Sequence, residues 1–316
     1  MNERHDTAYE AAYLYYMENL TMEQIAQHLY TSRATVSRLL KTARDTGIVQ
    51  IRLNENSKPQ TDLAQKLGDK YRVRVHLVKT SKEQSAISRM EKVAKRGAIL
   101  VDSCVEEGTS LGVAWGSTVT ELAKHLPYRP LKDVVVVQLN GAGNARHTGI
   151  PYSGSILGQI TAAYDAQMVH FPVPAFFDHS ETKEAMWRER SIMGVLATQR
   201  KADVAVFGIG AFGGAIPSHV YNGGYFDAQE QRELRANGVV GDMCTVLLRE
   251  DGSYQDLAVN QRATGPTATE LARIRRRIAV VSGNHRVLAL RGALRTGAIT
   301  DVVIDTQLAE ALMDCP

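Results

Sequence analysis

The first sixty residues have a regular pattern of apolar and polar positions. Two short runs each have the spacing of one helix face: Ile25, Ala26 and Leu29, and then Val36, Leu39 and Leu40. A polar segment, residues 30–32, separates the two runs. We therefore predict two helices joined by a tight turn, with a helix over residues 8–17 before them and a short wing strand over residues 48–53 after them.

Capping residues mark the ends of both helices. Thr21, with Gln24 three residues later, has the form of a capping box, and Ser32 can cap the second helix. Gly47 can end that helix in a left-handed conformation. Tyr30 occupies a turn position at which positive φ favours glycine, so we expect backbone strain there. The segment is a predicted winged helix-turn-helix.

The second helix of this motif is basic. Residues 33–44 include Arg33, Arg38, Lys41 and Arg44 but no carboxylate. Cations of this kind contact DNA phosphates, and short hydroxyl side chains can contact base edges. We predict that the residues that contact double-stranded DNA are Ser32, Arg33, Thr35, Ser37, Arg38, Lys41 and Arg44. An amphipathic hairpin with a solvated basic face is the alternative.

The helix over residues 8–17 is rich in tyrosine. It contains Tyr9, Tyr13, Tyr15 and Tyr16. Their helical spacing favours packing residues over residues that stack on bases.

Beyond residue 60, strand-like and helix-like segments alternate. The predicted strands are residues 73–78, 111–115, 134–139, 168–171, 202–207, 277–281 and 301–305. The predicted helices are residues 85–106, 119–125, 184–200, 286–294 and one that begins at residue 307. This alternation indicates an α/β domain with a mostly parallel sheet covered on both faces. We expect a DNA-binding domain over residues 1–55, a linker over residues 56–60, and an effector-binding and oligomerisation domain over residues 61–316.

Composition excludes several classes of protein. The chain has 316 residues and a net charge of +3, which does not indicate a general polyanion binder. Cys104, Cys244 and Cys315 lie far apart, so neither a disulfide scaffold nor a zinc site is expected. There is no apolar signal core at the N-terminus and no run of about 20 apolar residues. We expect a soluble cytoplasmic protein without a membrane segment.

Two small polar loops follow predicted strands. Gly116, Ser117 and Thr118 open a predicted helix, where they could hold a phosphate or sugar or could form a plain turn capped by Ser117. Asn140, Gly141 and Gly143 end the next strand. Ligands of parallel sheets bind beyond such strand ends.

A third loop contains G-x-G-x-x-G at residues 208–213. A dinucleotide site would require a helix to start there, but Gly214, Pro217, Gly223 and Gly224 follow closely. We therefore exclude a dinucleotide site.

Few residues suggest catalysis. The chain has no G-x-S-x-G elbow between a predicted strand and a predicted helix and no H-E-x-x-H motif, so we predict no catalytic residue, metal site or cofactor. Asp242 could accept hydrogen bonds from sugar hydroxyls or could be a turn residue, and Arg286 at the start of a helix could meet an anion. The basic run of Arg273, Arg275, Arg276 and Arg277 is interpreted as a solvated face.

Six motifs in order resemble the SorC family of bacterial sugar-responsive transcriptional regulators. They are L-T-M-E-Q-I-A at 20–26, S-R-A-T-V-S-R-L-L at 32–40, G-V-A-W-G-S-T at 112–118, A-D-V-A-V-F-G-I-G at 202–210, G-V-V-G-D-M at 238–243 and R-G-A-L-R-T-G-A-I-T at 291–300. The resemblance implies a Rossmann-like effector domain similar to glucosamine-6-phosphate deaminase, ribose-5-phosphate isomerase and CoA transferases. It also implies a phosphorylated sugar effector that alters operator binding, usually by a tetramer.

By motif match, the family's ligand pocket falls on the 116–118 and 140–143 loops, Asp242 and Arg286. The family usually has G-G-x-x-K where this chain has S-G-N-H-R at 282–286. Arg286 keeps the charge but changes a point charge into a fork, so an unphosphorylated sugar or polyol is also possible. We expect a homo-oligomeric regulator, more readily a repressor. The alternative is a sugar-phosphate-metabolising enzyme with a DNA-binding appendage, since fold does not fix function.

Overall fold

The computed structural model describes residues 3–49, 62–144 and 148–315. The chain divides into two units, Met1–Lys58 and Pro59–Pro316. The predicted linker and most of the predicted wing strand lie outside the described residues. Among the helices of these ranges, none combines the length and apolar character that crossing a bilayer requires.

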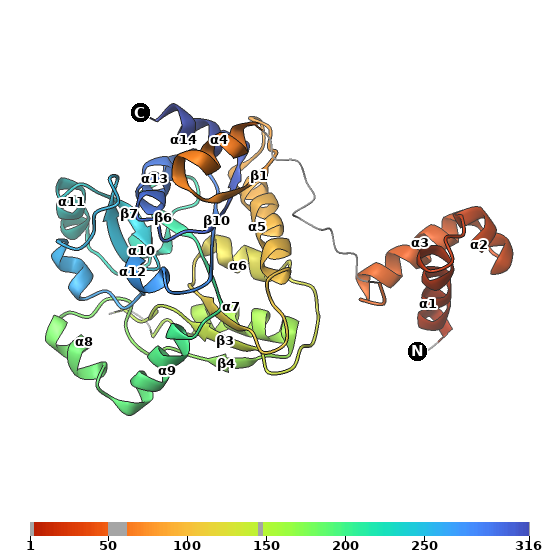
Figure 1. Cartoon of the computed structure of the whole chain (residues 1–316), viewed down its shortest axis with the longest axis horizontal. Helices are drawn as coiled ribbons and strands as arrows, with labels where there is room; N and C mark the ends of the chain where they lie inside the picture. The colour runs from red at the N-terminus through yellow and green to blue at the C-terminus, as the bar shows by residue number, and fades with distance from the viewer. Residues whose placement is uncertain (1–2, 50–61, 145–147, 316) are drawn as a thin grey trace. The chain divides into compact units, whose positions relative to one another are not determined.

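The described part of the N-terminal unit consists of α1 (Glu3–Tyr16), α2 (Met22–His28) and α3 (Arg33–Asp45). In Figure 1, α3 crosses α1, and α2 lies against both. Their shared core consists of small and branched residues, which allow close crossing: Ala8, Ala11, Ala12, Leu14, Ile25, Ala26, Val36, Leu40 and Ala43.

Seven parallel strands form the central sheet of the second unit. In spatial order they are β1 (Arg74–Val78), β10 (Asp301–Asp305), β9 (Arg276–Val281), β5 (Val204–Phe207), β2 (Ser110–Val113), β3 (Val135–Gln138) and β4 (Gln167–Val169). The chain builds outward from β2 through β3 to β4, and then from β5 through β9 to β10 on the other side. The strand order therefore reverses between β2 and β5, which is where a ligand crevice is expected.

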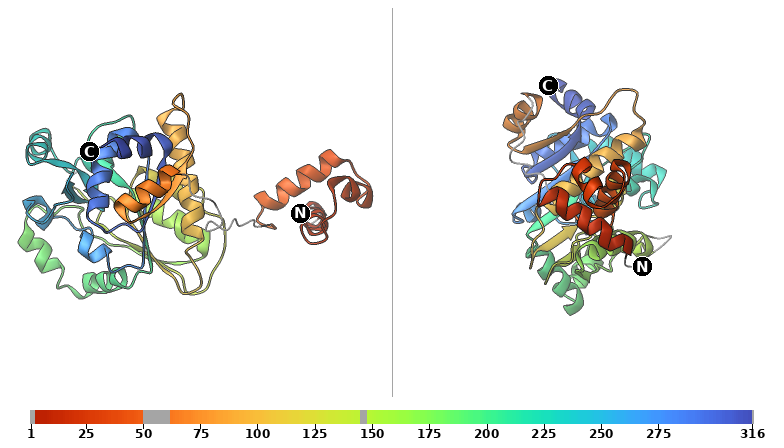
Figure 2. Two further views of the ribbon diagram at one scale, coloured as in Figure 1. Left: turned by 45° about the horizontal axis from the view of Figure 1, so that its top comes forward. Right: turned by 90° about the vertical axis from the view of Figure 1, so that its right-hand side faces the viewer.

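Alternate residues of the same strands face two different cores, as parallel strands covered on both faces require. Val204 and Val206 lie in one core, whereas Ala205 and Phe207 lie in the other. The first core contains α5 (Ala86–Asp102), α6 (Ser117–Ala123) and α7 (Ile150–Tyr164). The second contains α4 (Asp62–Tyr71), α13 (Val287–Arg295) and α14 (Thr306–Asp314). Figure 2 shows α4 and α14 side by side although they come from opposite ends of the unit.

A small antiparallel sheet, which no periodic pattern predicted, adjoins the second core. Its strands are β6 (Ile209–Ala211), β7 (Val239–Met243) and β8 (Val246–Arg249). Asp242 thus lies in a strand, so its alternative role as a turn residue is wrong. The remaining elements are α8 (Ser180–Met186), α9 (Arg190–Arg200), α10 (His219–Asn222), α11 (Ala228–Ala236), α12 (Ala268–Leu271) and the 3-10 helices η2 (Ala258–Gln261) and η3 (Asn284–Arg286).

The predicted helix over residues 184–200 is confirmed for residues 190–200, which form α9, but its continuity is wrong because residues 184–186 belong to the separate helix α8. Trp187 ends α8, and its ring packs edge-on against Phe171 and Phe177 at centroid distances of 5.6 and 6.0 Å. These tertiary contacts turn the chain where a periodic pattern alone would continue the helix.

Candidate functional site

A pocket lies beyond the carboxyl ends of β2, β3, β5 and β9, at the reversal in strand order. Six of the predicted effector residues line it: Gly116, Ser117, Thr118, Asn140, Asp242 and Arg286. The other lining residues are Ala114, Trp115, Gly208, Ile209, Gly210, Ser218, His219, Val220, Cys244 and Thr245. Segments far apart in the sequence therefore meet at the place where open α/β sheets bind ligands.

Gly116 caps α6 in an extended conformation (φ 161°) and without a side-chain cap, so the alternative of a turn capped by Ser117 is wrong. A Cβ atom at Gly116 would meet nothing within 4 Å. Protein packing therefore does not require glycine there, and its missing side chain leaves room in the pocket.

Gly141 and Gly143 lie outside the lining of this pocket. A Cβ atom on Gly141 would overlap the carbonyl of Pro174, and the Gly141 N–H donates to Thr264 Oγ1 at 3.0 Å. Gly143 forms a parallel bridge with Pro174. These glycines allow two backbones to approach closely, so the structure gives them a packing role.

Asp242 is the buried carboxylate of the pocket, with 5 % of the residue exposed. Its Oδ2 accepts a hydrogen bond from the Thr245 N–H at 3.2 Å, whereas its Oδ1 has no partner among the described residues. Burial raises the pKa of Asp242 to about 6, although the Thr245 N–H, Tyr221 and Arg286 oppose that rise. The Tyr221 hydroxyl lies beside this carboxylate without forming a hydrogen bond of normal geometry, so Asp242 can accept a further hydrogen bond.

Arg286 is the buried cation of the pocket. Its Nε donates to the Ile209 carbonyl at 3.1 Å, its Nη1 to Ser282 at 2.8 Å and its Nη2 to Ile216 at 2.9 Å. Burial lowers the pKa of Arg286 to about 10, so it stays charged at neutral pH. These three bonds leave two of the five guanidinium N–H groups for a ligand. Within the described structure, Arg286 and Asp242 form no direct ion pair.

Asn140 adds a second unsatisfied acceptor. It is 1 % exposed, and its Oδ1 has no partner among the described residues. Buried polar atoms normally have partners, so two bare oxygens beside one pocket indicate a site for hydrogen-bond donors.

Sequence reasoning missed an aromatic cluster beside this pocket, of which Trp115 and His219 belong to the lining. The Trp115 ring stacks on Tyr225 at 5.6 Å with an interplanar angle of 16°. His219 packs edge-on against Trp115 at 5.6 Å and lies 4.6 Å from the Tyr152 ring. Because His219 and Tyr225 come from a glycine-rich segment without periodicity, no pattern marked them.

Sequence reasoning also missed the strained turn between β7 and β8. Cys244 and Thr245 are buried, and both have positive φ, at 52° and 67°. Two-residue hairpin turns of this kind favour Asn-Gly, and a β-branched residue at positive φ is strained. This turn orients the Thr245 N–H towards Asp242.

The free space in the pocket is about 40 Å³. At ~10–15 Å³ for each water, it holds roughly three water molecules. A sugar would therefore require the pocket to widen. Across the described ranges, no group of three or more His, Cys, Asp or Glu side chains is arranged to hold a metal ion.

The predicted caps of the N-terminal helices are confirmed. Thr21 and Gln24 form a capping box, and the Ser32 hydroxyl accepts the Thr35 N–H at 3.2 Å. Gly47 has φ 79°, and Tyr30 has the positive φ, 50°, that the turn position predicted.

The predicted DNA-contacting residues lie on the surface of α3, with Thr35 half-buried. Three of the cations already have partners, and one of these is Arg38, whose Nη2 donates to Thr35 Oγ1 at 3.2 Å. Arg33 Nε is 2.8 Å from Glu23 Oε1, and Arg44 Nη1 donates to the Tyr16 hydroxyl at 3.1 Å. Lys41 is exposed and has no ion-pair partner in the described part of the chain. Within the structure described, its charge is therefore free for another partner.

Among the tyrosines of α1, Tyr15 and Tyr16 pack against the core as predicted. Tyr9 and Tyr13 are instead 59 % and 46 % exposed, so the packing interpretation is wrong for them. The helix periodicity could not show which flank of α1 its neighbours leave uncovered.

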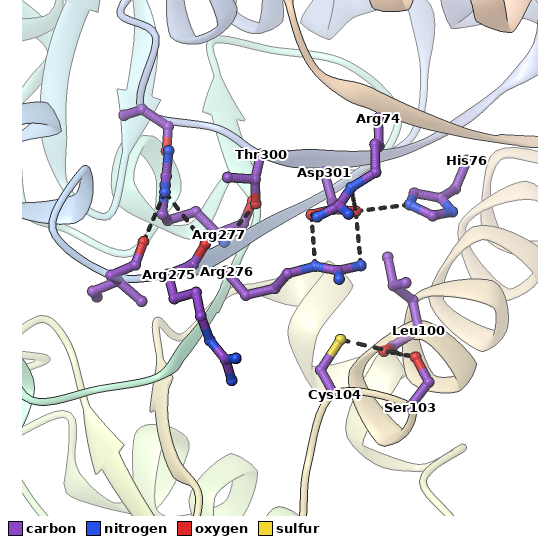
Figure 3. A network of polar contacts seen from close by, with 12 residues as sticks. Arg74, His76, Leu100, Ser103, Cys104, Arg275, Arg276, Arg277, Thr300 and Asp301 are labelled. Carbon is purple, nitrogen blue, oxygen red and sulfur yellow. Dashed lines mark hydrogen bonds and ion pairs between the residues drawn. The ribbon is translucent and has the colours of Figure 1, made fainter. Parts of the chain in front are cut away.

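Only part of the 273–277 basic run is solvated. Arg276 forms a two-bond contact with the fully buried Asp301 at 2.9 and 3.0 Å, and Arg74 and His76 contact the same carboxylate (Figure 3). Arg277 donates to the Ala298 and Ile274 carbonyls. Arg273 and Arg275 are exposed. The solvated-face interpretation is therefore wrong for Arg276 and Arg277.

The Asp301 network joins β1, β9 and β10 at the amino ends of the strands, away from the pocket. The hydrogen bond from His76 and the charge of Arg276 lower the pKa of Asp301 despite its burial. The network therefore has a structural role.

All three cysteines are free thiols, as expected.

Comparison with known proteins agrees with this architecture. The Sugar-bind family, described as "Putative sugar-binding domain", matches residues 55–314. The deoxyribonucleoside regulator of Bacillus subtilis (strain 168) is 30 % identical over 99 % of this chain and 98 % of its own length. The sorbitol operon regulator of Klebsiella pneumoniae is 26 % identical over 96 % of both chains.

The crystal structure of full-length SorC from Klebsiella pneumoniae matches with a TM-score of 0.76. It is 25 % identical and covers 99 % of this chain and 100 % of its own. These relatives are named as regulators, which removes the basis for the alternative of a sugar-phosphate-metabolising enzyme. The chain therefore belongs to the Sugar-bind family and is a transcriptional regulator of the SorC type.

Proposed function

We propose that α3 binds operator DNA and that a polyhydroxylated effector in the pocket controls this binding. Residues 1–55 act as a winged helix-turn-helix, and residues 61–316 bind the effector and hold the oligomer together in the cytoplasm. The observation that supports the effector site most directly is the meeting of two bare acceptor oxygens and one buried cation at the strand-order reversal. The effector relieves repression.

The DNA-binding face of α3 follows from its burial pattern. Val36, Leu40 and Ala43 are buried against the other helices. Positions 34, 37, 38 and 41 are spaced i, i+3, i+4 and i+7, and all are exposed on the opposite side. Ser37, Arg38 and Lys41 therefore form the centre of the contact surface.

Ser32 and Thr35 have a different role, because their hydroxyls cap the helix and contact each other at 3.0 Å. They fix the start of α3, the end that enters the major groove in helix-turn-helix proteins. One helix-turn-helix motif makes few contacts with DNA, so tight binding requires at least a dimer on paired half-sites. A tetramer would also supply the paired motifs.

The bare oxygens define the chemistry of the effector. Asp242 Oδ1 and Asn140 Oδ1 can only accept hydrogen bonds, so they require donors such as sugar or polyol hydroxyls. The two unused N–H groups of Arg286 require an acceptor, which a phosphate or a hydroxyl oxygen supplies. A phosphorylated sugar satisfies both requirements, and an unphosphorylated polyol satisfies the first fully.

Effector entry must rearrange one wall of the pocket. Arg286 Nη2 bonds the Ile216 carbonyl, next to the lining residues Ser218–Val220. An anionic group on Arg286 competes with that carbonyl and allows the segment to move. Coupling of ~1–3 kcal/mol between the sites would change operator affinity about 5- to 150-fold.

Thermal shift measurements over sugars, polyols and their phosphates test the effector site. Wild type should be stabilised by at least one of these compounds, and Asp242→Asn should lose that shift because an amide nitrogen replaces an acceptor. Asp69→Asn, the same change at an exposed position of α4, should respond as wild type does. An equal response from Asp242→Asn and wild type would refute the site.

Salt-dependent DNA affinity tests the DNA-binding face. Lys41→Ala should weaken binding and lower the salt slope by about one unit. Arg33→Ala should have a smaller effect, because Glu23 already neutralises that guanidinium. Lys92→Ala, an exposed change on α5, is the control. Unchanged binding by Lys41→Ala and Arg38→Ala would overturn the assignment of α3.

A further inference from the structure

Tyr30 lies in the turn between α2 and α3, and its conformation is costly. The residue is 98 % exposed and has φ 50°. Large aromatic residues usually bury much of their surface, and a bulky residue at positive φ is an outlier. Both features are unfavourable for an isolated protein.

The fold does not require a tyrosine side chain at this position. The Tyr30 N–H donates to the Gln27 carbonyl at 3.3 Å, and the Thr31 N–H donates to Ala26 at 2.8 Å. These backbone bonds are available to any residue, and glycine adopts positive φ without steric cost. The nearby Tyr15 and Tyr16 pack against the core, whereas the Tyr30 ring faces solvent.

Strained residues persist where function requires their side chain. Tyr30 precedes the cap Ser32 by two residues and Arg33, the first residue of α3, by three. This is the end of α3 that enters the groove, where phosphates flank the helix. A phenol can donate a hydrogen bond to a phosphate oxygen, and its ring can pack on a deoxyribose.

We propose that Tyr30 contacts the DNA backbone, with its hydroxyl donating to a phosphate beside the half-site. This inference rests on the proposed DNA-binding role of α3. Because the phenol is uncharged, the contact releases no counterion and is independent of base sequence. It therefore has a signature different from that of Lys41 or Arg38.

The test uses the full chain and two duplexes of equal length. One is enriched from a random library by binding to wild type, and the other is random. Tyr30→Phe should bind both duplexes about 5- to 10-fold more weakly, with an unchanged salt slope. Tyr30→Gly should weaken binding at least as much, while hydrogen exchange of the α2 and α3 amides becomes a few-fold slower because the strain is relieved.

Tyr9→Phe, at an exposed tyrosine of α1, is the matched control and should bind as wild type does. Wild-type affinity of Tyr30→Phe and Tyr30→Gly, alongside weakened Lys41→Ala, would overturn this proposal and leave the DNA-binding role intact. Wild-type affinity of all three variants would overturn both. Exchange in Tyr30→Gly as fast as in wild type would contradict the strain, and dissociation of its oligomer without DNA would assign the ring to self-association instead.

Discussion

Replacing Asp242 by asparagine should abolish effector binding and yet increase the free energy of unfolding of the protein. The pKa of this buried carboxyl is about 6 in the folded chain, against an ordinary value of 3.8. Since a difference of one in pKa corresponds to about 1.4 kcal/mol, ionised Asp242 costs the folded state about 3 kcal/mol at pH 8. The amide side chain of the Asp242→Asn variant is neutral at every pH, and its oxygen can still accept the Thr245 N–H.

The sign follows from proton linkage. Folding raises the pKa of Asp242. The contribution of this carboxyl to folding stability is therefore fully present below pH 3.8 and is lost as the pH rises through 6. The gain from Asp242→Asn should therefore be largest above pH 6. It should fall to about half at pH 5 and disappear below 3.8.

Urea unfolding followed by tryptophan fluorescence measures this gain. Trp115 and Trp187 are the two tryptophans of the chain, and both lie in the unit that contains Asp242. Asp69→Asn should leave the unfolding free energy unchanged at pH 8 and at pH 5. A variant no more stable than wild type at pH 8, or a gain that does not vary with pH, would refute the reasoning from burial.

Three further substitutions test separate features. Gly210→Ala should abolish effector-induced stabilisation, because the new Cβ overlaps Asp242 Oδ1; a normal thermal shift with this variant would contradict the packing. Asp301→Asn should lower the free energy of urea unfolding by about 1–3 kcal/mol, because the half-exposed Arg276 and the exposed Arg74 lose a fully buried, charged acceptor; no measurable loss would count against the network. Thr21→Ala should cost about 1 kcal/mol by removing the capping box, seen as faster hydrogen exchange in α2, and unchanged exchange would argue against the cap.

Local chemistry made the helix-turn-helix predictable. Thr21, Ser32 and Gly47 act through hydrogen bonds and dihedral angles of their immediate neighbours, which sequence spacing encodes. The central strands were equally accessible, because continuous apolar runs such as residues 202–207 have few other places to lie in a small domain.

Elements stabilised by distant contacts were less predictable. Residues 150–164 form α7 although they contain Pro151, Gly154 and Gly158, because Ile156 and Leu157 are buried against the sheet. The β6–β8 sheet has short strands interrupted by glycine, so its periodicity is weak. Its pairing depends on the hairpin turn at Cys244 and Thr245, whose residues are not those that such turns favour.

The predicted site also has features that the sequence encodes and features that depend on distant contacts. The family resemblance assigns Asn140, Asp242 and Arg286 to one pocket, and the strand-order reversal explains why they meet. Spacing could not reveal that Gly141 supports a backbone crossing. It also could not reveal that Arg286 already bonds three carbonyls. Those facts depend on which segments pack opposite each residue.

The central claim is that the basic helix and the hydroxyl-accepting pocket are energetically linked. The direct measurement is the affinity of the full chain for its enriched duplex, with and without a sugar, polyol or sugar phosphate that raises the thermal midpoint. The account predicts that such a compound changes the affinity about 5- to 150-fold in wild type and leaves it unchanged in Asp242→Asn. A compound that stabilises wild type but leaves its DNA affinity unchanged would contradict the account.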